Sequence, residues 1–471
     1  MEIKQLYTGC LAEAAYYIES NGEAAIIDPL REVDQYIEMA ASRGATIKYV
    51  LETHFHADFV SGHLDLAKKT GAKIVYGPTA SANFDFHVAT DGEELPLGKM
   101  TIKVLHTPGH TMESASYLLL DESKTPHSIY TGDTLFIGDV GRPDLAVKTD
   151  LSQEDLASHL FDSLRNKIMP LPDHVMVYPG HGQGSACGKN MSKETFDTLG
   201  NQKKTNYALR ADMTREEFIQ AVLTGLVSPP QYFPKNAAMN KQGYRSFEEV
   251  REAGLRKLSV DQFENEMKVE NTIVLDTRHE SEFTKGFIPS SVFIGIDGTF
   301  APWVGVLIED LNSRILVVAD DGREEEVITR LARVGYDNPI GVLDGGFNAW
   351  ENAGKPTDAI RNISPEDFAN GYLGYTGIET LDVRKASEFE SQHIDGAKNL
   401  PLDFLLNTVE QLDKGKNYMV HCAGGYRSVA AASIMKKHGI SSVTNVLGGF
   451  KAIEQLGKLP ITEFHEQVTM L

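Results

Sequence analysis

Two histidines and an aspartate lie close together in the stretch Thr53-His54-Phe55-His56-Ala57-Asp58-Phe59. Residues 47–51 before it are apolar and partly β-branched, a pattern typical of a buried strand. Two histidines separated by one residue can point to a common centre, and imidazole is the commonest metal ligand at neutral pH. Asp58 adds a carboxylate oxygen. An isolated pattern of this kind is equally typical of a polar loop, so it needs support from the rest of the chain.

Three further turns repeat the arrangement of a short apolar strand that ends in His or Asp. They are His106-Thr107-Pro108-Gly109-His110 after residues 101–105, Thr131-Gly132-Asp133 after residues 128–130, and Pro179-Gly180-His181 after residues 175–178. Side chains at the ends of neighbouring strands converge on a β scaffold. We therefore expect these turns to form one metal site.

The order and spacing of these motifs resemble the metallo-β-lactamase superfamily over residues 1–245, which implies an αββα sandwich. Hydrolases of that superfamily usually carry His directly after the HxHxD aspartate, where it completes a second metal site. This chain has Phe59 there, and a phenyl ring cannot bind a metal. The resemblance then implies a single metal ion held by His54, His110 and Asp133.

Two imidazoles and one carboxylate suit a non-haem Fe(II) centre with positions open for O2 and substrate. The persulfide dioxygenase branch of the superfamily has this triad, and residues 138–144 and 178–182 resemble its loops. The resemblance implies that O2 oxidises a low-molecular-weight thiol persulfide to sulfite at one Fe(II) per chain. His56, Asp58 and His181 would then lie around the metal ligands and orient them or water.

Two residues near this predicted centre have alternative interpretations. Arg142 could hold an anionic part of the thiol carrier, or form a structural ion pair. Cys187 lies in a loop of small residues next to Lys189, a setting that can favour a reactive thiolate. A buried packing cysteine is the alternative, and it is the commoner case.

The second half of the chain is an internal repeat with alternating strand and helix patterns. Residues 272–283 return as 379–389, and residues 343–347 return as 447–450. Such a repeat predicts two α/β domains with parallel sheets. Its Asp-x-Arg, His-Ile-x-Gly-Ala and Gly-Gly-Phe motifs resemble rhodanese domains. We predict a multi-domain α/β protein with domains at residues 1–245, 255–358 and 362–471.

In the second copy, Cys422-Ala423-Gly424-Gly425-Tyr426-Arg427 joins a predicted strand to a helix. A cysteine at that point meets backbone N–H groups and the positive end of the helix dipole, which favour a thiolate. The resemblance implies that Cys422 and Arg427 are catalytic and that Gly424, Gly425 and Tyr426 bind the sulfur anion. Phosphate-cradling C-x5-R loops are one residue longer, which argues against a phosphatase.

The first copy has no cysteine at this point. Ala319 or Asp320 takes the position, depending on where a one-residue gap is placed. The acids of residues 320–324 would also repel a sulfur anion. We expect this copy to be a spacer or docking domain without sulfur transfer.

Bulk composition excludes several other classes of protein. A length of 471 residues suggests about three domains, and no apolar run approaches the ~20 residues of a membrane span. The N-terminus lacks a secretion signal, so we expect a cytoplasmic protein without a membrane partner. The formal net charge of −21 argues against nucleic acid as a partner. The three cysteines lie far apart and suggest no disulfide framework. Homo-oligomerisation stays open.

The complete prediction joins the two chemistries. Sulfite made in the first domain would accept sulfane sulfur carried on Cys422 and leave as thiosulfate. A glyoxalase II-like metal-dependent thioester hydrolase with a fused sulfurtransferase is one alternative, and Phe59 argues against it. A non-oxidising sulfur carrier or sensor is another, and the intact triad argues against it.

Overall fold

Two six-stranded sheets form the centre of the first part of the chain. The first sheet has the order β1 (Glu2–Thr8), β2 (Glu13–Ser20), β3 (Glu23–Ile27), β4 (Thr46–Leu51), β5 (Lys73–Tyr76) and β6 (His87–Val88). The second has the order β12 (Asp197–Thr198), β11 (Met176–Pro179), β10 (Pro126–Gly132), β9 (Ala115–Leu120), β8 (Met100–His106) and β7 (Glu94–Leu97). The computed structural model describes residues 1–146, 151–226, 229–372 and 377–463, so the end of the third predicted domain lies outside the described residues.

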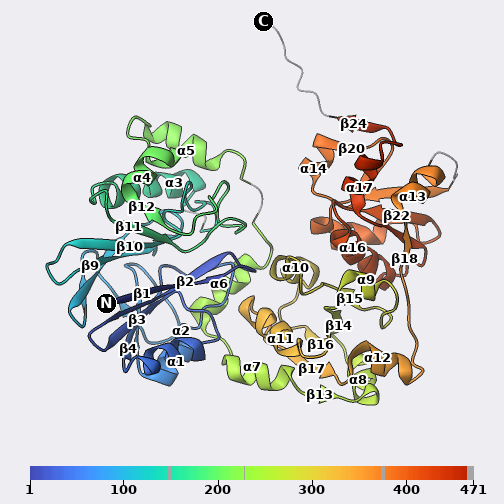
Figure 1. Ribbon diagram of the computed structural model, residues 1–471, viewed down its shortest axis with the longest axis horizontal. Coiled ribbons are helices and arrows are strands. Elements are labelled where there is room, and N and C mark those ends of the chain that lie inside the picture. Colours follow the sequence, from blue (N-terminus) through green and yellow to red (C-terminus); the bar gives the residue numbers. More distant parts are fainter. Residues whose placement is uncertain (147–150, 227–228, 373–376, 464–471) are drawn as a thin grey trace, which may run out of the picture. The chain divides into compact units, whose positions relative to one another are not determined.

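Helices cover the outer faces of both sheets (Figure 1). They are α1 (Asp34–Ser42) and α2 (His63–Thr70) on the first sheet, and α3 (Gln153–Ser163), α4 (Leu199–Thr205) and α5 (Arg215–Leu223) on the second. The alternation along β2 shows why three layers of core form. Tyr16 and Ile18 lie in the core between the sheets, whereas Ala15 and Tyr17 lie in the core under the helices. The predicted αββα sandwich is confirmed.

The four turns that carry His and Asp each follow a strand of this sandwich. Strand β4 ends before His54, β8 before His110, β10 before Asp133 and β11 before His181. The connection to the second half of the chain contains α6 (Phe233–Gln242) and α7 (Phe247–Gly254). The chain forms two compact units, residues 1–249 with 332–335 and residues 250–331 with 336–471.

The second unit contains two five-stranded sheets, and the strands within each sheet pair in parallel. The first has the order β13 (Lys257–Leu258), β17 (Pro339–Leu343), β16 (Arg314–Val318), β14 (Thr272–Asp276) and β15 (Val292–Phe293). Its helices are α8 (Val260–Met267), α9 (Glu280–Phe283), α10 (Phe300–Leu307), α11 (Glu324–Arg333) and α12 (Gly346–Asn352).

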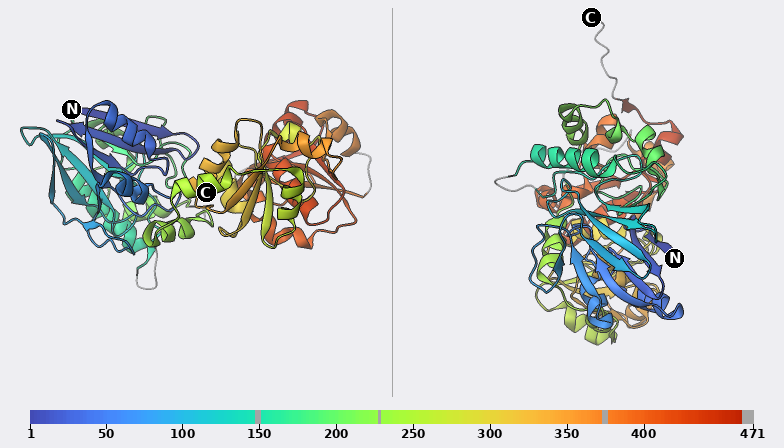
Figure 2. Two further views of the ribbon diagram at one scale, coloured as in Figure 1. Left: turned by 90° about the horizontal axis from the view of Figure 1, so that it is seen from below. Right: turned by 90° about the vertical axis from the view of Figure 1, so that its left-hand side faces the viewer.

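The second sheet of this unit repeats the plan. Its order is β18 (Arg361–Ile363), β23 (Val443–Val446), β22 (Asn417–His421), β19 (Ile378–Asp382) and β21 (Lys398–Asn399). Its helices are α13 (Pro365–Tyr372), α14 (Ala386–Ser391), α15 (Leu405–Thr408), α16 (Tyr426–Lys437) and α17 (Gly449–Leu456), and a small ribbon joins β20 (Gln392–Ile394) to β24 (Ile461–Glu463). The predicted α/β copies with parallel sheets are confirmed, and both can be followed from further directions in Figure 2.

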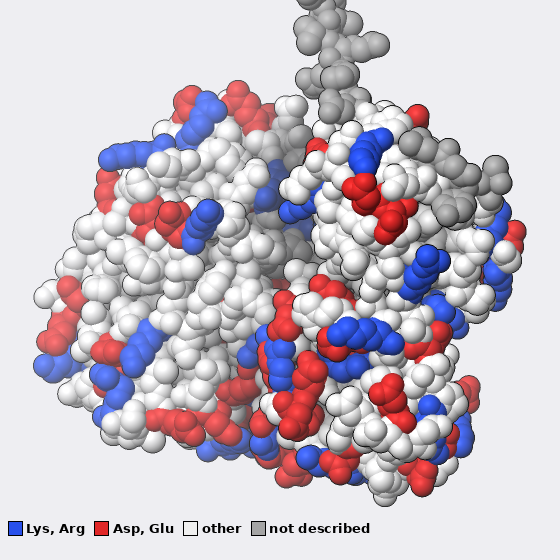
Figure 3. All heavy atoms as spheres, turned by 45° about the vertical axis from the view of Figure 1, so that its right-hand side comes forward, with Lys and Arg blue, Asp and Glu red and all other residues white. Residues whose placement is uncertain are grey.

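Two observations concern the surface charge and the helices. On the face drawn in Figure 3, acidic and basic side chains are interspersed, unlike the clustered Lys and Arg of a nucleic-acid surface. Within the described ranges, no helix combines the length and apolar content that a membrane span requires.

Candidate functional site

Side chains from three turns of the first unit meet at one buried point. His54, His110 and Asp133 each offer a ligand atom, and these atoms lie within 4.8 Å of one another. Asp133 Oδ2 is 3.4 Å from His110 Nε2 and 3.9 Å from His54 Nε2. Asp133 Oδ2 and His54 Nε2 have no hydrogen-bond partner. Buried polar atoms without partners are costly, so this donor set fits a bound metal ion.

Hydrogen bonds fix both imidazoles with Nε2 toward this point. The Thr53 hydroxyl donates to Asp28 Oδ2 at 2.8 Å and can therefore only accept from His54 Nδ1, 3.0 Å away. His110 Nδ1 lies 2.9 Å from the carbonyl oxygen of Arg142, so it donates its proton there. Burial and the nearby His56 lower the pKa of His54 well below its usual range, which keeps the ring neutral. A neutral ring with an outward Nδ1–H is the form that binds metals.

His181 orients the carboxylate of the triad. Its Nδ1 lies 2.7 Å from Asp133 Oδ1, and its Nε2 lies 2.7 Å from Asp58 Oδ2. Burial opposes a charged ring, but the two carboxylates outweigh it and raise the pKa of His181 well above its usual range. Burial likewise opposes ionisation of Asp133, and the charge of His181 lowers the pKa of Asp133 despite it. The pair leaves Asp133 Oδ2 turned toward the two triad histidines.

A second buried cluster surrounds His56 and was missed by the sequence analysis. His56 Nε2 lies 3.1 Å from Asp28 Oδ1 and 3.6 Å from Glu52 Oε2. Asp28 has a φ of 48°, a strained backbone conformation for a residue other than glycine. Its carboxylate accepts from the backbone N–H of Thr53 at 2.7 Å, which fixes the start of the histidine turn. Asp28 directly follows β3 and Glu52 directly follows β4. Their place at the ends of strands is the feature of the sequence that could have identified them as site residues.

Arg142 forms the ion pair that was one of its two interpretations from the sequence. Its guanidinium forms a bidentate ion pair with Asp144, with both N···O distances 2.7 Å, and also donates to the carbonyl oxygen of Ala186 at 3.2 Å. Its backbone N–H donates to the carbonyl oxygen of Cys187 at 3.0 Å. Arg142 therefore ties the Cys187 loop to the loop that orients His110.

Cys187 differs from the activated thiolate considered above. Burial, followed by the charges of Asp58 and Asp133, raises the pKa of Cys187 well above its usual range. Lys189 gives it no help, because its Nζ donates to the carbonyl oxygens of Ala221 and Thr224. Cys187 instead lies with Asp58 and His181 in a buried group whose ligand atoms are within 4.8 Å of one another. A cavity of about 380 Å³ is lined by residues 183–185 and 188–191 of this loop.

In the second copy of the repeat, Cys422 lies between β22 and α16, as the sequence predicts. It is buried, and its Sγ accepts from the backbone N–H of Gly425 at 3.1 Å and lies 3.6 Å from Ser428 Oγ. Gly425 has a φ of 120°, which an L side chain rarely adopts. The loop therefore aims the Gly425 N–H at the sulfur, as a thiolate or persulfide anion requires.

Arg427 has a partner that the sequence analysis missed. Its two terminal nitrogens lie 2.6 and 2.9 Å from the carboxylate oxygens of Glu388 on α14. The hydrogen bond to Arg427, against some burial, lowers the pKa of Glu388. The guanidinium is thus held in one place, and part of its charge is neutralised.

Strand pairing resolves which residue replaces the cysteine in the first copy. Asp276 pairs with Val318, as Asp382 pairs with His421, so Ala319 is equivalent to Cys422. The sequence alone left Ala319 and Asp320 open.

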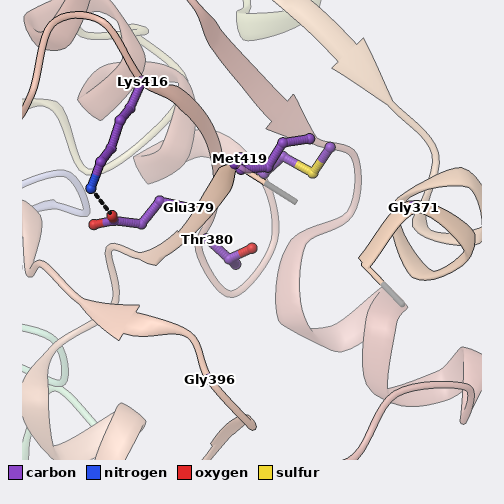
Figure 4. A pocket seen from close by; sticks show the side chains of 8 residues that line it. Gly371, Glu379, Thr380, Gly396, Lys416 and Met419 are labelled. Atoms are coloured by element: carbon purple, nitrogen blue, oxygen red, sulfur yellow. Dashed lines mark hydrogen bonds and ion pairs between the residues drawn. The ribbon is translucent and has the colours of Figure 1, made fainter. Parts of the chain in front are cut away.

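A cavity near the second sheet lies away from Cys422. It has a volume of about 520 Å³ and is lined by the start of β19 and the start of β22, where Lys416 pairs with Glu379 at 3.1 Å (Figure 4). Cys422 follows the opposite, carboxyl ends of these parallel strands, where ligands usually bind in such sheets. This cavity therefore does not form part of the cysteine site.

Comparisons with known proteins match both halves of the chain. Residues 8–181 match the metallo-β-lactamase superfamily, and residues 259–353 and 365–456 match the rhodanese-like domain. A probable hydroxyacylglutathione hydrolase of Schizosaccharomyces pombe is 31% identical, covering 40% of this chain and 71% of its own length. The mitochondrial persulfide dioxygenase of Bos taurus is also 31% identical, covering 42% of this chain and 71% of its own.

A solved structure extends the likeness beyond the first unit. The crystal structure of a metallo-β-lactamase from Staphylococcus aureus subsp. aureus COL is 31% identical, with a TM-score of 0.63, and covers 73% of this chain and 98% of its own. Together with the triad geometry and the repeated α/β fold, these matches show that the chain belongs to the metallo-β-lactamase superfamily and carries two rhodanese-like domains after its metallo-β-lactamase domain.

Proposed function

We propose that the first domain oxidises a low-molecular-weight thiol persulfide with O2 and that the last domain transfers sulfane sulfur to the product. The terminal sulfur of the persulfide loses four electrons to O2. Together with one water molecule this yields the free thiol, sulfite and two protons. The residues proposed to hold one Fe(II) per chain are His54, His110 and Asp133.

The observation that carries this proposal is Phe59. A two-metal hydrolase site needs a further ligand at this position, and Phe59 is a fully buried ring 4.3 Å from the ring of His56, centroid to centroid. Asp58 and His181, which would serve a second metal, are instead paired with each other. When bound, Fe(II) supplies redox chemistry toward O2 that none of these side chains has.

The chain's own residues would order the site for this reaction. Thr53 and the Arg142 carbonyl hold the two imidazoles, and His181 holds Asp133 with one oxygen free. Because His181 keeps both N–H groups engaged, it serves as a fixed orienting group and does not deliver a proton. The loop that contains Cys187 lines a cavity, and Cys187 itself lies near Asp58 and His181, so this loop is the proposed entry for the persulfide.

The second reaction would run on Cys422. Its thiolate attacks the terminal sulfur of a persulfide, forms a cysteine persulfide and releases the carrier thiol. Sulfite then attacks that terminal sulfur, the S–S bond to Cys422 breaks, and thiosulfate leaves as the thiolate is restored. The Gly425 N–H, 3.1 Å from Sγ, would stabilise the anion in both forms.

The deciding experiment combines metal analysis with O2 uptake on protein purified without air. We expect one iron per chain and O2 consumption that depends on a persulfide, with sulfite as product. The His110→Ala variant should lose both the iron and the O2 uptake. Two zinc ions per chain, with thioester hydrolysis and no O2 uptake, would overturn the proposal.

A thioester hydrolase is the second candidate. The hydroxyacylglutathione hydrolase relatives favour it, and so does one feature of the structure. Asp58, His181 and Cys187 form a group that could hold a second metal with a thiolate in place of the missing histidine. If so, Cys187→Ser would lower the metal content of the purified protein from two ions to one. In the dioxygenase proposal the same variant keeps one iron.

A further inference from the structure

Tyr426 belongs to the Cys422 loop but directs its side chain into the first copy of the repeat. Its hydroxyl donates to the carbonyl oxygen of Gly295 at 2.9 Å, and its ring lies 5.5 Å from that of Phe293, centroid to centroid. The sulfur-anion role that the sequence predicted for Tyr426 stays a prediction. The side chain faces the copy that has no cysteine.

The surface that receives Tyr426 is made of two glycines, Gly295 and Gly298. A Cβ on Gly298 would overlap the tyrosine ring, lying 2.6 Å from Cζ, and a Cβ on Gly295 would lie 3.2 Å from Cε2. Neither glycine has a φ in the left-handed region, so any residue could adopt its backbone conformation. At Gly298 the space taken by Tyr426 is what excludes a side chain, whereas at Gly295 Phe293 and the carbonyl oxygen of Arg278 also crowd the position.

Two arginines of the first copy hold this glycine segment in place. Arg330 on α11 donates to the carbonyl oxygen of Ile296 at 2.7 Å. Arg323, from the loop that replaces the cysteine loop, pairs with Asp297 at 2.7 Å and with Glu326 at 2.8 Å. The backbone N–H of Ile296 donates to the carbonyl oxygen of Thr277 at 3.0 Å. The segment is thus fixed on several sides.

A second contact shows that one face of α16, and not only the Tyr426 side chain, packs on the first copy of the repeat. The backbone N–H of Phe293 on β15 donates to Ser433 Oγ at 3.0 Å. Ser433 lies seven residues after Tyr426, which places both on the same face of α16. Strand β15 packs directly against α16. The N-terminus of this helix supplies the Gly425 N–H that contacts Cys422 Sγ.

We propose that the cysteine-less copy positions the active loop of the second copy, and that Tyr426, seated on Gly295 and Gly298, is the positioning residue. The inference rests on the proposed role of Cys422 as the sulfur carrier. It gives a mechanical role to the copy that the sequence predicts to be a spacer or docking domain. Displacing the ring moves the start of α16, and the Gly425 N–H aimed at Cys422 moves with it.

The test perturbs the contact from the side that has no part in sulfur chemistry. Gly298→Ala should change the rate at which iodoacetamide alkylates Cys422 by at least severalfold. It should also lower kcat for sulfur transfer by roughly ten- to a hundredfold. Tyr426→Phe keeps the ring and should retain most activity. Tyr426→Ala should resemble Gly298→Ala.

Gly415→Ala is the matched control, since a Cβ there meets only Asp413 Oδ1 at 3.4 Å. Rates are expressed per Cys422 titrated in folded protein, and persulfide-dependent O2 uptake reports on the rest of the chain. The double variant Gly298→Ala/Tyr426→Leu should lose less than the sum of the two single changes, because the shorter side chain relieves the overlap.

Unchanged Cys422 alkylation and unchanged kcat in Gly298→Ala would overturn the inference, as would strictly additive effects in the double variant. Alkylation needs no sulfur transfer, so its rate tests the positioning inference separately from the proposed sulfur-carrier function. A wild-type protein without sulfurtransferase activity would sink the proposed function. The positioning inference would still stand or fall on the alkylation rates.

Discussion

Phe59 lies in a turn whose backbone is held by a side chain from another part of the chain, Asn240. Asn240 Nδ2 donates to the carbonyl oxygens of both His56 and Phe59, each at 2.8 Å. A substitution at position 59 therefore changes the side chain without freeing the turn. Next to it, Asp58 and His181 keep a proton between them where a second metal ion would need their lone pairs.

We predict that Phe59→His lets the first domain take up a second metal ion. The new imidazole would join Asp58 and His181, and a divalent ion would displace the proton from His181. With added zinc, metal analysis should give two ions per chain for Phe59→His, against one for the wild type. Phe59→Leu, which also removes the ring but adds no ligand, should stay at one. Equal stoichiometry in all three proteins would contradict the prediction.

For single residues, the candidate metal ligands could be predicted from the sequence, whereas the ion-pair partners of the arginines near the two sites could not. His54, His110 and Asp133 stand in motifs with fixed spacing, and the structure brings them together. Glu388 and Asp144 stand in no motif, yet they pair with Arg427 and Arg142. A pair between two turns depends on where the turns lie in space, and no periodicity in the chain encodes that distance.

Among the elements, the turns after the strands pack too closely for side chains. A Cβ on Gly141 would overlap the carbonyl oxygen of Asp133 and lie 3.1 Å from His110 Nδ1. On Gly180 it would lie 2.9 Å from Asp133 Oδ1. Strand and turn positions were predictable from hydrophobic pattern and glycine content, but this close approach of one turn to another was not.

Gly141→Ala should accordingly lower both metal content and stability. Overpacking of this kind costs roughly 1–3 kcal/mol, and here it acts directly on two proposed ligands. Iron per chain and the thermal unfolding midpoint should both fall. Gly9→Ala is the control, because nothing lies within 4 Å of a Cβ at that position. A Gly141→Ala protein with full iron and an unchanged midpoint would show that the turns can move apart freely.

The pair between α14 and the Cys422 loop should show itself in the pH dependence of stability. Arg427 lowers the folded-state pKa of Glu388, so the pair stabilises the fold at neutral pH. That contribution is lost as the pH falls below the usual carboxyl range and through the lowered pKa. The effect is small because about a third of the Glu388 side chain is exposed, 35%.

Urea unfolding of the wild type and Glu388→Gln at several pH values checks this. The wild type should have the higher midpoint at neutral pH, and the difference should vanish in acid. A difference that grew on acidification would mean that the pair has the opposite linkage.

For the whole molecule, the repeat was visible in the sequence but the contact between its copies was not. Equivalent motifs identify two similar folds, and both copies have the same strand order apart from small additions. No periodic pattern in the sequence links Tyr426 to Gly298, so their contact could not be predicted from it. The two proposed chemistries lie in separate compact units with separate cores. Each should survive the loss of the other.

Cys422→Ser should separate the two reactions by their products. Serine has nearly the size of cysteine but a hydroxyl far too weakly acidic to act as the nucleophile, so no sulfane sulfur is carried to sulfite. The proposed metal ligands lie in the other unit and should be untouched. With a low-molecular-weight persulfide and O2, the wild type should yield thiosulfate. The variant should accumulate sulfite at a similar rate of O2 uptake, measured by chromatography after thiol labelling.

His110→Ala supplies the reciprocal result, since it should stop O2 uptake while sulfur transfer from added persulfide to added sulfite continues. Enzymatic thiosulfate formation by Cys422→Ser would instead require another carrier. Cys187 is buried and its thiol is held in the protonated form, so it is poorly suited to that role without a metal. The double variant Cys422→Ser/Cys187→Ser would then identify the carrier. Loss of thiosulfate only in the double variant would show that the assignment to Cys422 is wrong.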